Sequence, residues 1–269
     1  MARNLYALGD NRRVIRVDVS NLSNSTQLSG SLPNSLSFTD GGLTSHDGDL
    51  YALSSDISSS VDGRRLVRIN LANLASSTVF TPNLNQRSGE RLSALASHSD
   101  KLYVIYNRGY IIIYNIVGTD IPSATTVTGT ISGISGTFVE GMTSHSGNLY
   151  IVTRTGRIIR LNLRSSSSIL STNTLAGTLP LGGASARKQP VGLASHDGSM
   201  YVVTFEGGLF RVNSSNISTS TKLTGTIPGF HIGLASHEVD TSNYKVYLAG
   251  TLYGRMYIGG AEIANAYRK

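Results

Sequence analysis

Short runs of alternating hydrophobic and polar residues fill this chain, and one arrangement of them returns at intervals of about 45–50 residues. Its clearest copy is Gly-Leu-Ala-Ser-His-Asp-Gly-Ser-Met-Tyr at residues 192–201. Five further copies recur, at residues 42–51, 94–103, 141–150 and 233–247 and at Leu5-Tyr6. The copy at Leu5-Tyr6, which opens the chain, lacks the Gly-Leu-Ala-Ser-His head. A period of this length indicates a repeat architecture.

Each repeat predicts four short β-strands, which we name a to d. Strand a is the small apolar head, as in residues 192–196, and an Asp-Gly or Ser-Gly turn joins it to strand b as a hairpin. Strand b carries the apolar-Tyr pair, as in residues 200–204, and strand c follows, as in residues 157–163. Strand d is rich in Thr, as in residues 221–228. Small residues suit a crowded inner strand, and polar residues suit an outer edge.

Four antiparallel strands in each of six copies predict an all-β fold, a β-propeller formed by a single domain, residues 1–269. The six strand-b copies favour six blades, with five blades as the runner-up. A β-solenoid is the alternative, but its turns are usually shorter than this period. The first unit lacks strand a, and the chain ends in an atypical tail, residues 261–269. This tail either supplies the last strand d or returns to complete the first blade.

Strand c carries two columns of residues that share one face of the strand, because they are two positions apart. The first is mostly Arg: Arg16, Arg68, Ile113, Arg160, Arg211 and Tyr257. The second is mostly Asn or Asp: Asp18, Asn70, Asn115, Asn162, Asn213 and Gly259. We expect the Arg side chains to be packed or paired. We expect the short Asn and Asp side chains to bond the backbone of the c–d turn.

The Gly-Leu-Ala-Ser-His-x-Gly-x-Leu-Tyr unit resembles a repeat found in proteins of bacteria, phages and marine invertebrates that are taken to be β-propellers. The resemblance covers nearly the whole chain. It implies the propeller fold and assigns no catalytic residue. The chain has no Trp, so it departs from the WD40 pattern and from the Trp-rich sugar pockets of several propeller lectins.

The Ser-His column invites interpretation as a nucleophile and its base, but an active site is normally built once and this pair recurs in every complete unit. We therefore expect each His to stand at the a–b hairpin and to bond a neighbouring Ser or backbone group. The column is His46, His98, His145, His196 and His237. The strand-b Tyr column is expected to pack between blades. We assign no catalytic residue. If a catalytic site exists at the axis, its best candidates are residues that depart from the repeat columns: Glu140, Glu206, His231 and Tyr257.

The composition narrows the class of protein. The chain has no Cys, and it lacks metal-ligand spacings and phosphate-binding loops, so we expect no metal site and no cofactor. No apolar run is long enough to span a bilayer. The start of the chain has no apolar signal segment. We expect a virion or cytoplasmic protein, or a cell-surface protein from which a signal has been removed.

Charge is distributed unevenly between the two predicted faces of the ring. In a propeller, the b–c turns and d–a loops share one face, which we name the basic face, and the a–b and c–d turns share the other, which we name the acidic face. The formal net charge of +7 is expected to concentrate on the basic face. Its candidate binding residues are Arg12, Arg13, Arg64, Arg65, Arg87, Arg91, Arg108, Arg154, Arg157, Arg187 and Lys188.

The leading hypothesis is a non-enzymatic binding or structural propeller, a virion or cell-surface component whose basic face mediates protein–protein assembly or self-association. Lectin-like binding of glycans, including acidic ones, at several repeats is the second hypothesis. A glycan lyase or hydrolase with its site at the central channel is the third, and it rests on analogy with other propellers. Nucleic-acid binding is disfavoured, because the basic residues lack interleaved aromatics and a recognition motif.

Overall fold

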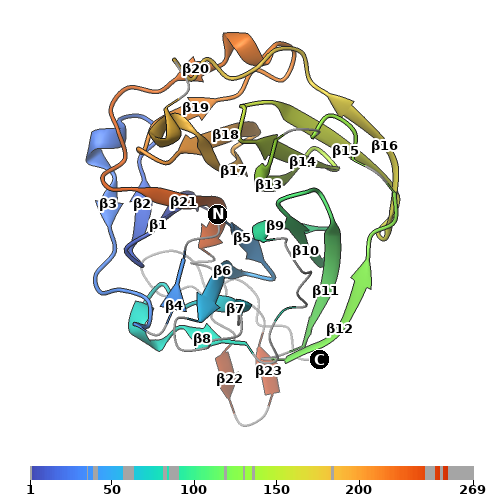
Figure 1. Ribbon diagram of the computed structural model, residues 1–269. Helices are drawn as coiled ribbons and strands as arrows, with labels where there is room; N and C mark the ends of the chain where they lie inside the picture. The colour runs from blue at the N-terminus through green and yellow to red at the C-terminus, as the bar shows by residue number, and fades with distance from the viewer. Residues whose placement is uncertain are drawn as a thin grey trace.

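The computed structural model describes residues 2–34, 36–38, 42–56, 64–80, 84, 91–117, 120–129, 131–134, 137–182, 185–239, 246–248 and 251–253. Within these residues the chain forms a ring of five blades, each with four antiparallel strands in the order a to d from the axis outward (Figure 1). The predicted all-β propeller is therefore confirmed.

Blades 2 to 5 each use one continuous segment of chain. Blade 2 contains β5 (Leu43–His46), β6 (Asp49–Asp56), β7 (Arg64–Ile69) and β8 (Thr78–Val79), and β4 (Leu36–Ser37) pairs with the end of β6. Blade 3 contains β9 (Leu92–His98), β10 (Lys101–Tyr106), β11 (Ile111–Val117) and β12 (Asp120–Thr126). Blade 4 contains β13 (Val139–His145), β14 (Asn148–Thr153), β15 (Ile158–Ser165) and β16 (Ser168–Thr174). Blade 5 contains β17 (Pro190–His196), β18 (Ser199–Thr204), β19 (Leu209–Arg211) and β20 (Thr221–Lys222).

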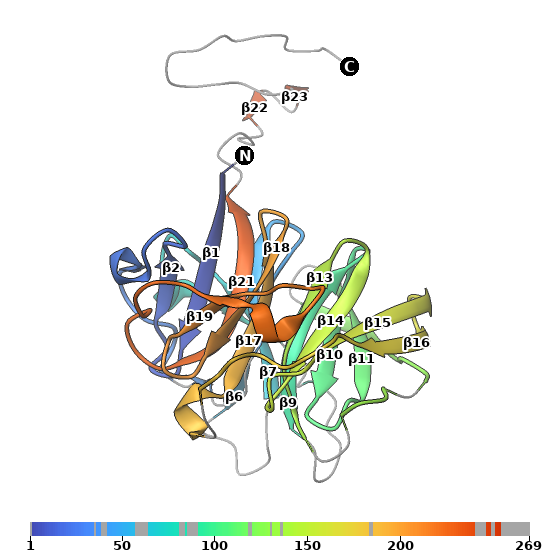
Figure 2. The same cartoon turned by 90° about the horizontal axis from the view of Figure 1, so that it is seen from above.

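Blade 1 joins the two ends of the repeat array. Its strands b, c and d are β1 (Ala2–Gly9), β2 (Val14–Val17) and β3 (Thr26–Gln27), and its strand a is β21 (His231–Val239). Strands β1 and β21 pair in register from Ala2 opposite Val239 to Leu8 opposite Gly233. Figure 2 views the ring from the side and shows β1 and β21 next to each other. The first and last repeats therefore complete one blade between them.

The structure has five blades, the runner-up count, and the expectation of six is corrected. Counting apolar-Tyr pairs counts b strands, but a blade also needs its own strand a. The last strand a, β21, is already paired with β1. The sixth apolar-Tyr pair lies in β22 (Val246–Leu248), which pairs with β23 (Thr251–Tyr253) and with no strand of the described blades. The tail, residues 261–269, lies outside the described residues.

The core of the molecule lies between adjacent blades. The strand-b Tyr side chains of the five blades are all at least nine-tenths buried, as predicted: Tyr6, Tyr51, Tyr103, Tyr150 and Tyr201. Each packs among aliphatic residues of its own and a neighbouring blade. The Tyr103 hydroxyl also donates a hydrogen bond of 2.9 Å to the carbonyl of Ser166, so its polar end is satisfied.

Short 3-10 helices lie in the c–d and d–a connections, and tight turns join strands a and b. The helices are η1 (Leu22–Asn24), η2 (Leu74–Ser76), η3 (Ala186–Lys188) and η4 (Ile217–Thr219). In the a–b turn of blade 2, Asp47 and Gly48 have φ angles of 48° and 79°. Two successive positive φ angles define the type I′ hairpin that the Asp-Gly sequence predicts. No helix in the described part of the chain is long and apolar enough to cross a membrane.

Candidate binding face

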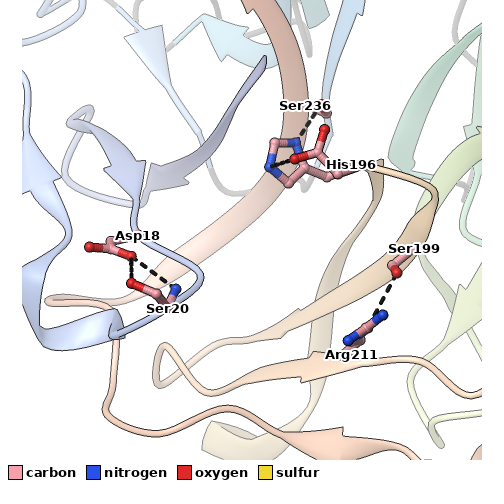
Figure 3. Close-up of polar contacts among 7 residues, drawn as sticks. Asp18, Ser20, His196, Ser199, Arg211 and Ser236 are labelled. Atoms are coloured by element: carbon pink, nitrogen blue, oxygen red, sulfur yellow. Dashed lines mark hydrogen bonds and ion pairs between the residues drawn. The ribbon is translucent and has the colours of Figure 1, made fainter. Parts of the chain in front are cut away.

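The Ser-His column forms a closed ring of hydrogen bonds between blades. Each His Nδ1 lies 2.8–2.9 Å from the Ser Oγ of the next blade: His46–Ser97, His98–Ser144, His145–Ser195, His196–Ser236 and His237–Ser45. Figure 3 shows the His196–Ser236 member of this ring. The last pair closes the circle between blades 1 and 2. The prediction that each His bonds a neighbouring Ser is confirmed, and the partner belongs to the adjacent blade.

Each imidazole in this circle of hydrogen bonds also contacts residues of its own blade. The ring of His196 meets Tyr201 edge to face at 6.2 Å between centroids, and equivalent pairs occur in the other four blades. The Nε2 atoms of His46 and His196 lie 3.5 Å and 3.4 Å from carboxylate oxygens of Asp47 and Asp197. These contacts give the column a structural role.

The five Ser side chains line a small cavity at the axis of the ring. Its volume is about 110 Å³, and aliphatic side chains such as Leu43, Met142 and Leu193 line it together with the hydroxyl groups. Glu140, Glu206 and His231 do not line it. Among the described residues, no group of three His, Asp or Glu side chains is arranged to hold a metal ion.

Stability should fall in mild acid. Burial lowers the pKa of His98, His145 and His231 below the ordinary value of 6.5, because a charged imidazolium loses hydration inside the protein. The unfolded chain therefore binds more protons than the folded chain as the pH falls through about 6.5. The stabilising contribution of these neutral imidazoles is complete above that pH and is lost below it.

Urea unfolding at about pH 7.5 and about pH 5.5 measures this dependence. We expect a lower urea midpoint at the acidic pH, and a smaller difference in a His98→Gln variant. A midpoint that stays constant or rises in acid would contradict the assignment.

The second strand-c column bonds the backbone of the c–d turn in blades 1, 2 and 5, as predicted. In blades 3 and 4 the side chains of Asn115 and Asn162 instead donate to the hydroxyl groups of Ser123 and Ser171 in strand d. Asp18 accepts hydrogen bonds from the hydroxyl of Ser20 at 2.6 Å and from its backbone N–H at 2.9 Å (Figure 3). These bonds stabilise the charged carboxylate and lower the pKa of Asp18. Asn70 and Asn213 accept equivalent backbone bonds in blades 2 and 5. In the Arg column, Arg68 lies 3.6 Å from Asp49 and Nε of Arg211 donates to Ser199, whereas the buried Nε of Arg160 has no hydrogen-bond partner among the described residues.

Backbone hydrogen bonds place the b–c turns and the d–a loops on one face. The N–H of Phe205, in the b–c turn of blade 5, donates to the carbonyl of Gln189, in the preceding d–a loop. In blade 3, the N–H of Asn107 donates in the same way to the carbonyl of Arg91. On the opposite face, Lys101 at the a–b turn donates to Ser166 in the c–d turn of blade 4. The predicted grouping of loops is therefore correct.

The predicted basic residues occupy several separate sectors of this face. Arg12 and Arg13 lie in the b–c turn of blade 1, where their guanidinium groups donate to the Asn34 carbonyl and the Gln27 side chain. The others occur in turns, loops or strand ends of later blades: Arg64 and Arg65 in blade 2, Arg91 and Arg108 in blade 3, Arg154 and Arg157 in blade 4, and Arg187 and Lys188 before blade 5. Arg87 lies outside the described residues, and the side chain of Arg64 is not described.

Phe side chains that lie outside the repeat columns stand beside two of these cations. The guanidinium of Arg154 lies 4.8 Å from the ring centroid of Phe138, and that of Arg187 lies 5.9 Å from that of Phe230. Phe230 also stacks on Phe205 at 4.8 Å, although 41% of its own surface is exposed. Their position in the sequence could have indicated this placement, since Phe138 and Phe230 both come directly before a strand a.

The residues that depart from the repeat columns lie near this face: Glu140 and His231 at the starts of strands β13 and β21, and Glu206 in a b–c turn. Glu140 forms an ion pair with Arg154, whose Nε lies 2.6 Å from Oε1 of Glu140. Glu206 lies in the b–c turn of blade 5, and its N–H donates to the carbonyl of Arg187. His231 is fully buried, with Nε2 3.2 Å from the carbonyl oxygen of Ile227. Glu140, Glu206 and His231 are thus dispersed, and Tyr257 lies outside the described residues.

Two hollows of ligand size lie on opposite faces. The first, on the basic face, has a volume of about 580 Å³ and is lined by Arg154, Thr155, Leu179, Pro180, Leu181, Gly182, Ser185, Lys188 and Gln189. The second, on the acidic face, has a volume of about 340 Å³ and is lined mainly by polar groups of blade 5: Ser199, Arg211, Asn213, Ser214, Thr219 and Thr221. The two hollows therefore differ in chemistry, the first being largely apolar with a cationic rim.

Comparisons with known proteins identify the chain as a β-propeller protein and go no further. No protein-family model matches the chain, and no curated protein matches its sequence. The structure of a nidogen/laminin complex has 11% identity and a TM-score of 0.52, over 88% of this chain and 99% of that chain. Glutaminyl cyclase of Myxococcus xanthus has 13% identity and a TM-score of 0.46, over 76% and 72% of the two chains. At 11% identity the likeness to the nidogen/laminin structure shows the fold alone.

Proposed function

We propose that this protein is a non-enzymatic structural propeller that assembles through its basic face, with the acidic face of a second copy as partner. The observation that carries the proposal is the pair of arginine–phenylalanine contacts, Arg154–Phe138 and Arg187–Phe230, on this face. Arg and aromatic residues are enriched among the residues that dominate the energy of protein interfaces.

The acidic face offers a complementary surface. Asp47 and Asp197 stand in a–b turns, and their side chains are 72% and 67% exposed. Asp100 occupies the corresponding turn of blade 3 and is also exposed. Contact between a basic face and an acidic face is heterologous, so it builds rings or filaments of stacked propellers. Such an assembly suits a virion or cell-surface component.

Charge reversal on the basic face should weaken stacking. We expect the protein to associate at about 50 mM salt and to dissociate at about 500 mM, because exposed charges are screened at high ionic strength. An Arg154→Glu, Arg187→Glu double variant should associate at least about tenfold more weakly. Sedimentation velocity measures both effects.

The matched control reverses a charge on the other face. Arg164 is exposed near the c–d turn of blade 4, so Arg164→Glu makes the acidic face more acidic and should preserve or strengthen association. A wild-type protein that is monomeric at low salt, or whose association ignores salt, would overturn the proposal. Equal weakening by both reversals would also overturn it.

Lectin-like glycan binding is a second candidate, and the polar hollow on the acidic face favours it. Hydroxyl and amide groups line this hollow, and Arg211 Nε donates to Ser199 Oγ at 3.2 Å (Figure 3). Groups of this kind can bond sugar hydroxyls. A glycan array tests this candidate, and the absence of any bound glycan would count against it. The enzyme hypothesis gains no comparable support from the described residues.

A further inference from the structure

The largely apolar hollow on the basic face, which we name the blade 4–5 pocket, has the dimensions of a small-molecule site. Its volume of about 580 Å³ falls within the range of about 300–1,000 Å³ that is usual for ligand pockets. It lies between the b–c turn of blade 4, at Arg154 and Thr155, and the d–a loop that leads to blade 5. This loop differs from the corresponding loops in sequence, so the pocket is not a repeated feature of the units.

The floor of the pocket is aliphatic and is fixed by the backbone. Leu179 is 4% exposed, and its N–H donates to the carbonyl of Gly156 at 3.0 Å. The N–H of Leu181 donates in turn to the Leu179 carbonyl at 2.9 Å. Pro180 restricts the backbone between these two residues. The floor is therefore shaped before any ligand arrives, which lowers the entropy cost of binding.

One side of the rim is a guanidinium held in place from two directions. Nε of Arg154 donates to Oε1 of Glu140 at 2.6 Å, and the ring of Phe138 lies below the guanidinium at 4.8 Å. These two contacts leave the terminal Nη nitrogens without a partner among the described residues. An Arg fixed in this way presents paired N–H donors, which match the geometry of a carboxylate.

The other side of the rim is an anchored ammonium group. Lys188 Nζ donates to the carbonyl of Gly182 at 2.8 Å, which uses one of its three N–H donors. Within the described residues, no carboxylate lies within ion-pair distance of this ammonium group. The pocket thus combines an aliphatic floor with two positive charges, of which only that of Arg154 is paired.

We propose that the blade 4–5 pocket binds a small organic anion with an apolar body, whose acidic group lies between Arg154 and Lys188 and whose apolar part covers Leu179 and Leu181. The apolar contact contributes burial, and the two cations fix orientation and select negative charge. This goes beyond the proposed assembly, because the site needs neither a second copy nor a partner protein.

Octanoate is a suitable probe, with acetate and octan-1-ol as matched ligands that lack the chain and the charge respectively. Isothermal titration calorimetry of the full chain should show octanoate binding at least about tenfold more tightly than either control. Lys188→Gln and Leu181→Ser should each weaken octanoate binding by about tenfold, through charge and apolar contact respectively. Arg164→Gln, at an exposed cation of blade 4 on the opposite face, should leave binding unchanged.

Three outcomes would overturn the proposal: no detectable octanoate binding, equal binding of octanoate and octan-1-ol, or wild-type binding by both Lys188→Gln and Leu181→Ser. Because Leu181→Ser alters the floor, thermal melting of each variant checks that it is folded. Lys188→Gln removes the charge and the hydrogen bond to the Gly182 carbonyl but leaves the aliphatic floor intact, so it keeps the test decisive if Leu181→Ser unfolds. Stacking is read separately by sedimentation without octanoate, so either proposal can fail alone.

Discussion

A chain that ends at Gly229 is expected not to form the propeller. It lacks β21, so β1 loses its partner on the inner side along the whole register from Ala2 to Gly9 and keeps only β2. The ring of inner strands then has a gap, because β21 packs between β17 and β5. Leu234, which is 1% exposed, and its buried neighbour Ile232 are also lost.

The expected loss is larger than the whole stability of a typical domain. Removing one buried aliphatic side chain costs about 2–5 kcal/mol, and a native domain is stable by about 5–15 kcal/mol. This truncation removes several such side chains together with a full set of strand hydrogen bonds. Far-ultraviolet circular dichroism measured across a urea titration should show no cooperative unfolding transition.

A chain that ends at residue 240 is the matched control, because it retains all of β21. It should unfold cooperatively, as blade 1 is complete. If the chain that ends at Gly229 unfolded with an unchanged midpoint, strand β21 would not be closing the ring.

The Gly192→Val variant should be severely destabilised. A Cβ atom at Gly192 would lie 2.7 Å from the backbone nitrogen of Leu234 and 2.9 Å from the backbone carbon of Gly233. These are main-chain atoms of the adjacent inner strand, so they cannot rotate away as a side chain can. Gly141 meets the backbone of Leu193 in the same way, also at 2.7 Å. Only a residue without a side chain allows the inner strands to approach this closely.

The expected cost of Gly192→Val is about 3 kcal/mol or more, since overpacking must push two inner strands apart. Urea unfolding measures the loss. Gly198→Asn is the matched control from the same hairpin: nothing lies within 4 Å of a Cβ there, and Asn tolerates a φ of +73°. Equal midpoints for the two variants would show that the inner strands are not closely packed at Gly192.

The repeats made most of the fold predictable, because each unit carries its own local signals. The Asp47-Gly48 turn and the strand-b Tyr residues occupy the predicted positions. Repetition also distinguished scaffold from site, because a Ser-His pair recurs in every complete unit. In the structure each His of these pairs bonds the Ser of the next blade, as His196 bonds Ser236.

The number of blades was harder to predict because it depends on a contact between the chain ends. Nothing local in residues 231–239 indicates that this strand pairs with β1 instead of opening a sixth blade. The blade 4–5 pocket was missed for a related reason. Arg154 and Lys188 were selected as basic residues, but their position around Leu181 depends on how two unequal loops fold together.

The most direct test of ring closure by the two chain ends is a disulfide across β1 and β21. Arg3 and Glu238 are opposite each other in these strands, and the chain has no Cys of its own. An Arg3→Cys, Glu238→Cys variant should therefore form an intramolecular disulfide in high yield under mild oxidation. An Arg3→Cys, Asp197→Cys control, which places the second thiol in a turn of blade 5, should not. Free thiols in the first variant, or equal cross-linking in both, would contradict a propeller closed by its first and last repeats.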